Sequence, residues 1–211
     1  MIKYRYIILL LLFISCHTTK ITNSWKNDSY KNYQPKKVLV LGITPNKEAR
    51  DFYEKNLTFE LNKRNIRAYE GFNILEPDFL NLNQAEQEIE NEVEELIELG
   101  FDTVLLATVK GFEERIPFDG NIFKNNDSFY GFENYYFLNQ DIYNDRDYFK
   151  KYKVFHLEVS LYNISNKNQK KLVWLATYDI VDPKKIKNTI KKCISKILKS
   201  LEKEGIIPLI N

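Results

Sequence analysis

Two short apolar runs constrain the fold of this chain more than any other feature of its sequence. The first is KVLVLGI at residues 37–43, and the second is TVLLATV at residues 103–109. A strand with one face in water alternates apolar and polar residues, whereas these runs stay largely apolar at consecutive positions, which predicts burial of both faces. Strands of that kind lie inside parallel sheets that helices cover, so the sequence predicts an α/β fold.

The segments between the two runs predict the helices that parallel strands need as connections. Asn46 can cap a helix over residues 47–64, and residues 66–69 predict a short second strand. A second helix is expected to begin with the capping-box-like segment at residues 83–86 and to end at Gly100. The apolar face expected for the first helix consists of Phe52, Leu57, Phe59 and Leu61.

The C-terminal third predicts an antiparallel hairpin followed by a helix. Residues 154–164 alternate between apolar and polar side chains, and a polar turn at 165–170 leads into an apolar run at 172–181. Pro183 then begins a basic amphipathic helix that Gly205 ends. The full expectation is a mixed sheet in the order β-α-β-α-β-(long loop)-β-β-α, with the helices packed on the sheet.

The first fifteen residues predict an export signal. Lys3 and Arg5 precede eight consecutive apolar residues at positions 7–14, which is the charge and hydropathy pattern of a secretory signal. The alternative, a transmembrane anchor, needs about 20 apolar residues, and this run is interrupted at Ser15. We therefore expect residues 1–15 to be removed as a signal peptide.

Residues 13–16, Phe-Ile-Ser-Cys, resemble the lipobox of bacterial lipoproteins, in which apolar residues and one small residue precede a cysteine. Leu is usual where this chain has Phe13. The resemblance implies a diacylglycerol thioether on Cys16 and an acylated amino group after cleavage, so that covalent lipid attaches the protein to a membrane. The three residues after Cys16 include no acid of the kind associated with inner-membrane retention. We therefore expect the periplasmic face of the outer membrane.

The remaining chain divides into a tether and one domain. Residues 16–36 are polar and lack periodicity, which predicts a lipidated cysteine and a flexible tether, and residues 37–211 are expected to form a single α/β domain. Loss of Lys3 and Arg5 with the signal reduces the 31 basic residues to the same number as the 29 acidic ones. A neutral chain lacks the basic surface that binds nucleic acid, so no such partner is expected.

Three segments carry a resemblance to small periplasmic lipoproteins of unknown function. They are residues 36–64, GFDTVLLATV at 100–109, and KLVWLATYDI at 171–180 with the helix after it. The folds of such proteins are similar to the amino-terminal domain of the translocation protein TolB and to the curli secretion lipoprotein. The resemblance implies a non-enzymatic binding or assembly module of the cell envelope and supplies no catalytic residue, because fold alone does not give function.

The alternative function is a periplasmic hydrolase that uses carboxylates near the end of the central strand. Glu113 and Glu114 stand where open α/β sheets bind ligands, and Asp119 and His156 are the other candidate groups. If the strand continues through Glu113 and Glu114, their side chains point to opposite faces of the sheet, so the two carboxylates could not act on the same substrate. The chain has two histidines and no metal-binding or phosphate-binding motif, so no metal and no cofactor are expected.

Residues 112–150 contain twelve phenylalanine and tyrosine residues among many Asn and Asp, without helical or strand periodicity. A loop of that length usually has a function or is disordered. Because Tyr brings a large contact area at small entropy cost, we expect this loop to bind another envelope protein through Tyr130, Tyr135 and Tyr136. The alternative is a loop that folds back over the sheet.

Cys193 is the one cysteine besides Cys16. With Cys16 committed to lipid, no internal disulfide can form, and the position of Cys193 on the apolar stripe of the last helix predicts a small buried hydrophobe. The alternative is a reactive or dimer-forming thiol, which would need a group nearby that lowers the thiol pKa.

Overall fold

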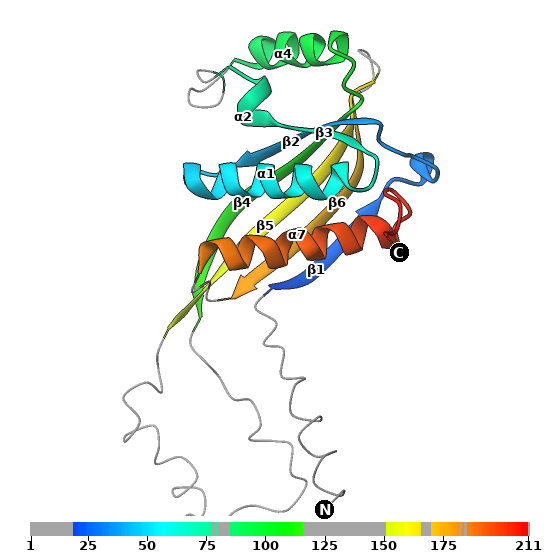
Figure 1. Ribbon diagram of the computed structural model, residues 1–211. Coiled ribbons are helices and arrows are strands. Elements are labelled where there is room, and N and C mark those ends of the chain that lie inside the picture. The colour runs from blue at the N-terminus through cyan, green and yellow to red at the C-terminus, as the bar shows by residue number, and fades with distance from the viewer. Residues whose placement is uncertain are drawn as a thin grey trace, which may run out of the picture.

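A six-stranded mixed sheet organises the chain (Figure 1). The computed structural model describes residues 19–76, 79, 85–115, 151–165, 170–181, 183 and 185–210. The strands are β1 (Thr19–Lys26), β2 (Lys37–Ile43), β3 (Arg67–Glu70), β4 (Thr103–Arg115), β5 (Tyr152–Asn163) and β6 (Lys171–Val181). They lie in the order β1-β6-β5-β4-β2-β3. The predicted α/β class with a mixed sheet is confirmed.

The two apolar runs form the parallel part of the sheet, as predicted. β2 pairs in parallel with β3 on one side and with β4 on the other. Val38, Leu39, Val40 and Leu105 are each at most 1% exposed. Since successive strand residues point to opposite faces, burial of three consecutive residues means that β2 is covered on both sides.

The predicted hairpin is present, and the strand before it is longer than expected. β5 pairs antiparallel with both β6 and β4, and the ladder with β4 runs out to the pair Arg115–Tyr152. The expectation of a loop from residue 112 is therefore wrong for residues 112–115, which belong to β4. Backbone pairing extends the strand although its last residues are mostly exposed. Residues 116–150 lie outside the described residues, together with Tyr130, Tyr135 and Tyr136.

The expectation of a flexible tether over residues 16–36 is also wrong where the structure describes it. Residues 19–26 form β1, an edge strand that pairs antiparallel with β6, and Asp28–Tyr30 forms the 3-10 helix η2. Only the first residue of β1, Thr19, is buried. The strand is held by backbone hydrogen bonds, so its sequence lacks the apolar alternation that predicts a strand. Residues 1–18, which include Cys16, lie outside the described residues.

Helices cover both faces of the sheet. They are α1 (Lys47–Asn62), α2 (Gly71–Ile74), α4 (Glu86–Glu98) and α7 (Ile186–Lys203). α1 and α7 lie side by side across one face over the larger apolar core, while α2 and α4 supply a smaller core on the opposite side of β2 (Figure 1). The cap by Asn46 is confirmed, because its side chain accepts a hydrogen bond from the Ala49 N–H. No described helix is long and apolar enough to cross a membrane.

The buried face of α1 differs from the predicted one. Its inward residues are Arg50, Tyr53, Glu54, Leu57, Thr58 and Leu61, whereas Phe59 is 59% exposed. This stripe follows the spacing of one helical face, but three of its six members are polar or charged. Leu57 and Leu61 are buried as predicted, whereas Phe52 is half-buried and Phe59 is exposed. The polar members of the face were missed because the prediction ranked residues by hydropathy alone.

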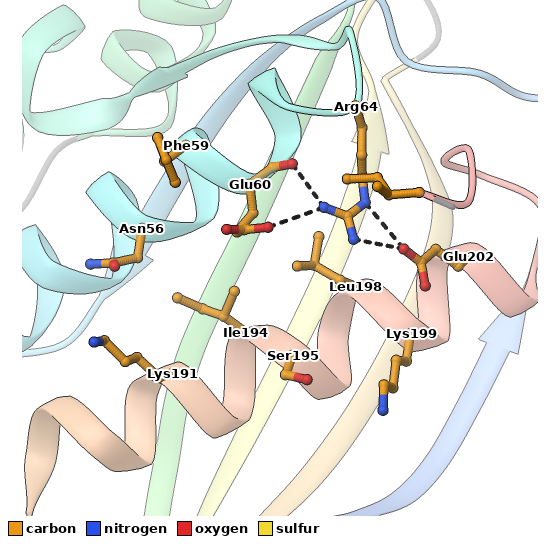
Figure 2. A pocket seen from close by; sticks show the side chains of 11 residues that line it. Asn56, Phe59, Glu60, Arg64, Lys191, Ile194, Ser195, Leu198, Lys199 and Glu202 are labelled. Atoms are coloured by element: carbon orange, nitrogen blue, oxygen red, sulfur yellow. Dashed lines mark hydrogen bonds and ion pairs between the residues drawn. The ribbon is translucent and has the colours of Figure 1, made fainter.

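A small ionic network ties the C-terminal end of α1 to that of α7 (Figure 2). The Arg64 guanidinium donates from Nη2 to Glu202 Oε1 at 2.7 Å and from Nη1 to the Glu60 carbonyl oxygen at 2.9 Å. The Arg64 and Glu202 side chains are 9% and 13% exposed. Removing one partner would leave the other charge nearly buried without compensation, which is costly.

Arg64→Met should lower the free energy of unfolding by about 2–3 kcal/mol, because Glu202 would keep its charge without its partner. Urea denaturation measures this change. Lys187→Met is the matched control, since Lys187 and Glu48 also join α7 to α1 at 3.0 Å but are 57% and 67% exposed. It should change stability by no more than about 0.5 kcal/mol. Equal effects of the two substitutions would contradict this account.

Candidate functional site

A cavity of about 660 Å³ lies between one face of the sheet and the N-terminal halves of α1 and α7. Its volume falls within the range of ~300–1,000 Å³ that is usual for small-molecule sites. The strands contribute Gly42, Ile43, Ala107, Val109, Phe112, Phe155, Leu157 and Ile180. The helices contribute Ala49, Arg50, Tyr53, Ile186, Thr189, Ile190 and Cys193. The wall is therefore mainly hydrocarbon.

Large apolar side chains of this wall are exposed to solvent. Ile43, Val109, Phe112 and Ile186 are each between 41% and 55% exposed. The rings of Phe112 and Phe155 contact each other with centroids 5.5 Å apart. Single exposed apolar residues are ordinary, but a contiguous group of them around a hollow indicates a surface that a ligand or partner covers.

Two buried donors in the wall lack hydrogen-bond partners. Arg50 Nε and the Tyr53 hydroxyl make no hydrogen bond, although these residues are only 8% and 7% exposed. The Nε atom of Arg50 lies 3.6 Å from Asp51 Oδ1, and the Arg50 charge also acts to lower the pKa of Glu54. Burial raises the pKa of Tyr53 well above its ordinary value, so its hydroxyl remains a donor. Both atoms are themselves shielded from solvent, so they are buried behind the wall and do not face the open cavity.

The carboxylate of Glu54 holds the backbone around this wall. It is fully buried and accepts one hydrogen bond from the Gly42 N–H and another from the Phe72 N–H, each at 2.9 Å. The chain passes so closely here that a Cβ on Gly71 would lie 2.7 Å from Leu41 Cδ1. Burial raises the pKa of Glu54, while the two N–H donors act in the opposite direction. Glu54 therefore joins α1, the end of β2 and the start of α2.

Cys193 forms part of the cavity wall and is buried, as predicted. It is 3% exposed, and burial raises its pKa to about 11. A thiol with so high a pKa is almost entirely protonated at neutral pH, which disfavours the alternative of a reactive nucleophile.

The carboxylates of the alternative hydrolase do not converge. β4 continues through Glu113 and Glu114, which places them on opposite faces. Glu113 accepts a hydrogen bond from Arg115 and lies 3.6 Å from His156 Nε2, whereas Glu114 lies 3.5 Å from Lys151 Nζ. None of these residues lines the cavity, and Asp119 lies outside the described residues.

His156 has a second acidic neighbour, since its Nδ1 lies 2.9 Å from Asp179 Oδ1. Phe155 and Leu157 line the cavity, so His156 between them points to the opposite face of the hairpin, where its side chain is 41% exposed. Among the residues that the structure describes, no group of three His, Cys, Asp or Glu side chains could hold a metal ion.

Sequence reasoning missed the polar part of the wall. Arg50, Tyr53 and Glu54 share one helical face with Leu57 and Leu61, and that spacing was the available signal. Of the aromatic residues counted in 112–150, Phe112 falls within the described residues and reaches the cavity. The three tyrosines predicted to bind a partner remain a prediction.

Comparisons with known proteins give distant likenesses. No family model and no curated protein matches this chain. One structure of the PelC dodecamer from Paraburkholderia phytofirmans has a TM-score of 0.43 and 15% identity, and the match covers 87% of this chain and 96% of the PelC chain. A second PelC structure has a TM-score of 0.42 and 13% identity, and the match covers 87% of this chain and 95% of the PelC chain. Lipoprotein GNA1162 from Neisseria meningitidis has a TM-score of 0.43 with 12% identity over 80% of this chain and 99% of that chain. The resemblance to small periplasmic lipoproteins stays a prediction.

Glu54→Gln should lower the free energy of unfolding by about 1–3 kcal/mol at pH 7, because an amide can accept from only one of the two N–H groups. The raised pKa of Glu54 means that the folded state binds a proton more tightly than the unfolded state. The wild type should therefore gain stability relative to the variant as the pH falls from 7 towards 4.5.

Glu60→Gln is the control for this pH dependence, since Lys63 and Arg64 lower the pKa of Glu60. The contribution of Glu60 to stability is present above its unfolded pKa and is lost as the pH falls through its folded pKa. Urea denaturation at a series of pH values should show opposite trends for the two variants. Parallel trends would show that the Glu54 carboxyl is not in the buried setting described here.

Proposed function

We propose that this chain is a lipid-anchored protein of the cell envelope that acts by binding and not by catalysis, and that its ligand enters the cavity between the sheet, α1 and α7. The observation that carries the proposal is an apolar cavity of about 660 Å³ with large apolar side chains exposed at its rim. The anchor is the lipid predicted on Cys16, and the proposed location is the periplasmic face of the outer membrane.

The wall favours a ligand with a long apolar body. An acyl chain has one, since its methylenes would cover the exposed rim formed by Val109, Phe112 and Ile186. Each buried methylene contributes ~0.8 kcal/mol, so a few of them offset the loss of the ligand's freedom. A hydrolase is not supported by the same observations, because the cavity wall contains no nucleophile with an adjacent base among the described residues.

The binding of a fluorescent fatty acid tests this proposal. The protein used should begin at His17, because every described strand and helix lies after that residue. Titration should show saturable binding of one probe per chain. Phe112→Lys, which puts a charge on the cavity rim, should weaken binding by about tenfold or more, the equivalent of ~1.4 kcal/mol.

Leu99→Lys is the matched control. Leu99 is 59% exposed, close to the 55% of Phe112, but it does not line the cavity. Both substitutions are on the surface and should leave stability within about 0.5 kcal/mol of wild type. Equal loss of affinity in both variants, or no saturable binding to the wild type, would overturn the proposal.

A further inference from the structure

The chain enters the sheet beside the cavity. Thr19, the first residue of β1, is 2% exposed, and its Oγ1 lies 3.8 Å from Cys193 Sγ. In the strand ladder Thr19 stands opposite Ile180. Both Cys193 and Ile180 belong to the cavity wall. The point where the described chain begins is therefore in direct contact with the site.

This position leaves a very short connection to the predicted lipid. Cys16 precedes Thr19 by three residues, which span at most ~11 Å even when fully extended. A tether of twenty residues would let the domain stand away from the bilayer, whereas three residues keep the start of β1 close to it. Any acyl group on Cys16 therefore begins within ~11 Å of Thr19, which contacts the cavity wall at Cys193.

We infer that the cavity takes an acyl chain carried by the protein's own Cys16, an inference that rests on the proposed function. Covalent attachment gives such a chain a high effective concentration at the cavity, in the millimolar range for short linkers, which favours it over free acyl chains.

The fit also follows from the character of the rim. Val109, Phe112 and Ile186 form an exposed apolar border, and the wall behind them is mainly hydrocarbon. The diacylglycerol and the acylated amino group of Cys16 together would carry three acyl chains. Two of them in the bilayer would keep the protein attached, because firm anchoring requires two acyl chains. The remaining acyl chain, bound in the cavity, then holds the domain in a fixed position at the membrane surface.

Photochemical cross-linking within the full chain tests this inference. Cells that produce the wild type are grown with a long-chain fatty acid bearing a diazirine near its end, which lipoprotein synthesis attaches to Cys16, and intact cells are irradiated. Mass spectrometry of the digested protein should find peptides joined through the lipid to residues 107–112 or 186–193. Phe112→Lys should reduce their yield by about tenfold, whereas Leu99→Lys should leave it unchanged.

The Cys16→Ser chain separates the protein's own lipid from free fatty acid. Cross-links at the cavity that persist in this variant at the wild-type yield would come from free fatty acid and would overturn the inference. Label on wild-type Cys16 that joins only to membrane lipids would also overturn it, while saturable binding of the fluorescent probe would leave the proposed function standing. If Cys16 carried no label, both the predicted lipid anchor and this inference would be overturned.

Discussion

The buried carboxylate of Glu54 is the interaction on which the arrangement around the cavity depends. A single side chain of α1 accepts hydrogen bonds from the backbone at the end of β2 and at the start of α2. An ionisable group without solvent is costly unless it is well bonded, so its presence fixes the rotation of α1 against the sheet. That rotation places Arg50 and Tyr53, one turn or less away on the same face, in the cavity wall.

The packing of the two long helices against the sheet differs between their two ends. Arg64 and Glu202 join α1 and α7 near their C-terminal ends (Figure 2). Leu61 and Leu201, in the same part of the helices, are almost completely buried. Near the N-terminal ends the helices face small strand residues such as Gly42 and Ala107, and the space is not filled. The cavity proposed to bind a ligand lies at this N-terminal end, and a second hollow of about 520 Å³ lies between α1 and α7 beside Arg64 and Glu202 (Figure 2).

The sequence predicted the parts of the fold that depend on apolar periodicity. The buried residues Val38 to Val40 and Leu105 predicted the parallel strands, and Leu157, Val159 and Leu161 predicted the hairpin, because buried positions carry apolar residues at regular spacing. The sequence of β1 has no such spacing, since backbone pairing at a sheet edge constrains side chains weakly. Arg50 and Glu54 were missed for a related reason, because a charged side chain does not look like a core residue even when the fold buries it. The contact of Thr19 with Cys193 depends on pairing between distant segments, which no local pattern encodes.

Methyl NMR tests most directly whether an acyl chain binds between the sheet, α1 and α7. In protein that begins at His17 and is labelled at isoleucine methyl groups, addition of a saturated fatty acid should shift the signals of Ile43, Ile180, Ile186 and Ile190, which line the cavity. The signals of Ile66, Ile89 and Ile164, which lie elsewhere in the fold, should stay in place. Shifts confined to this second group, or spread equally over both, would contradict the account.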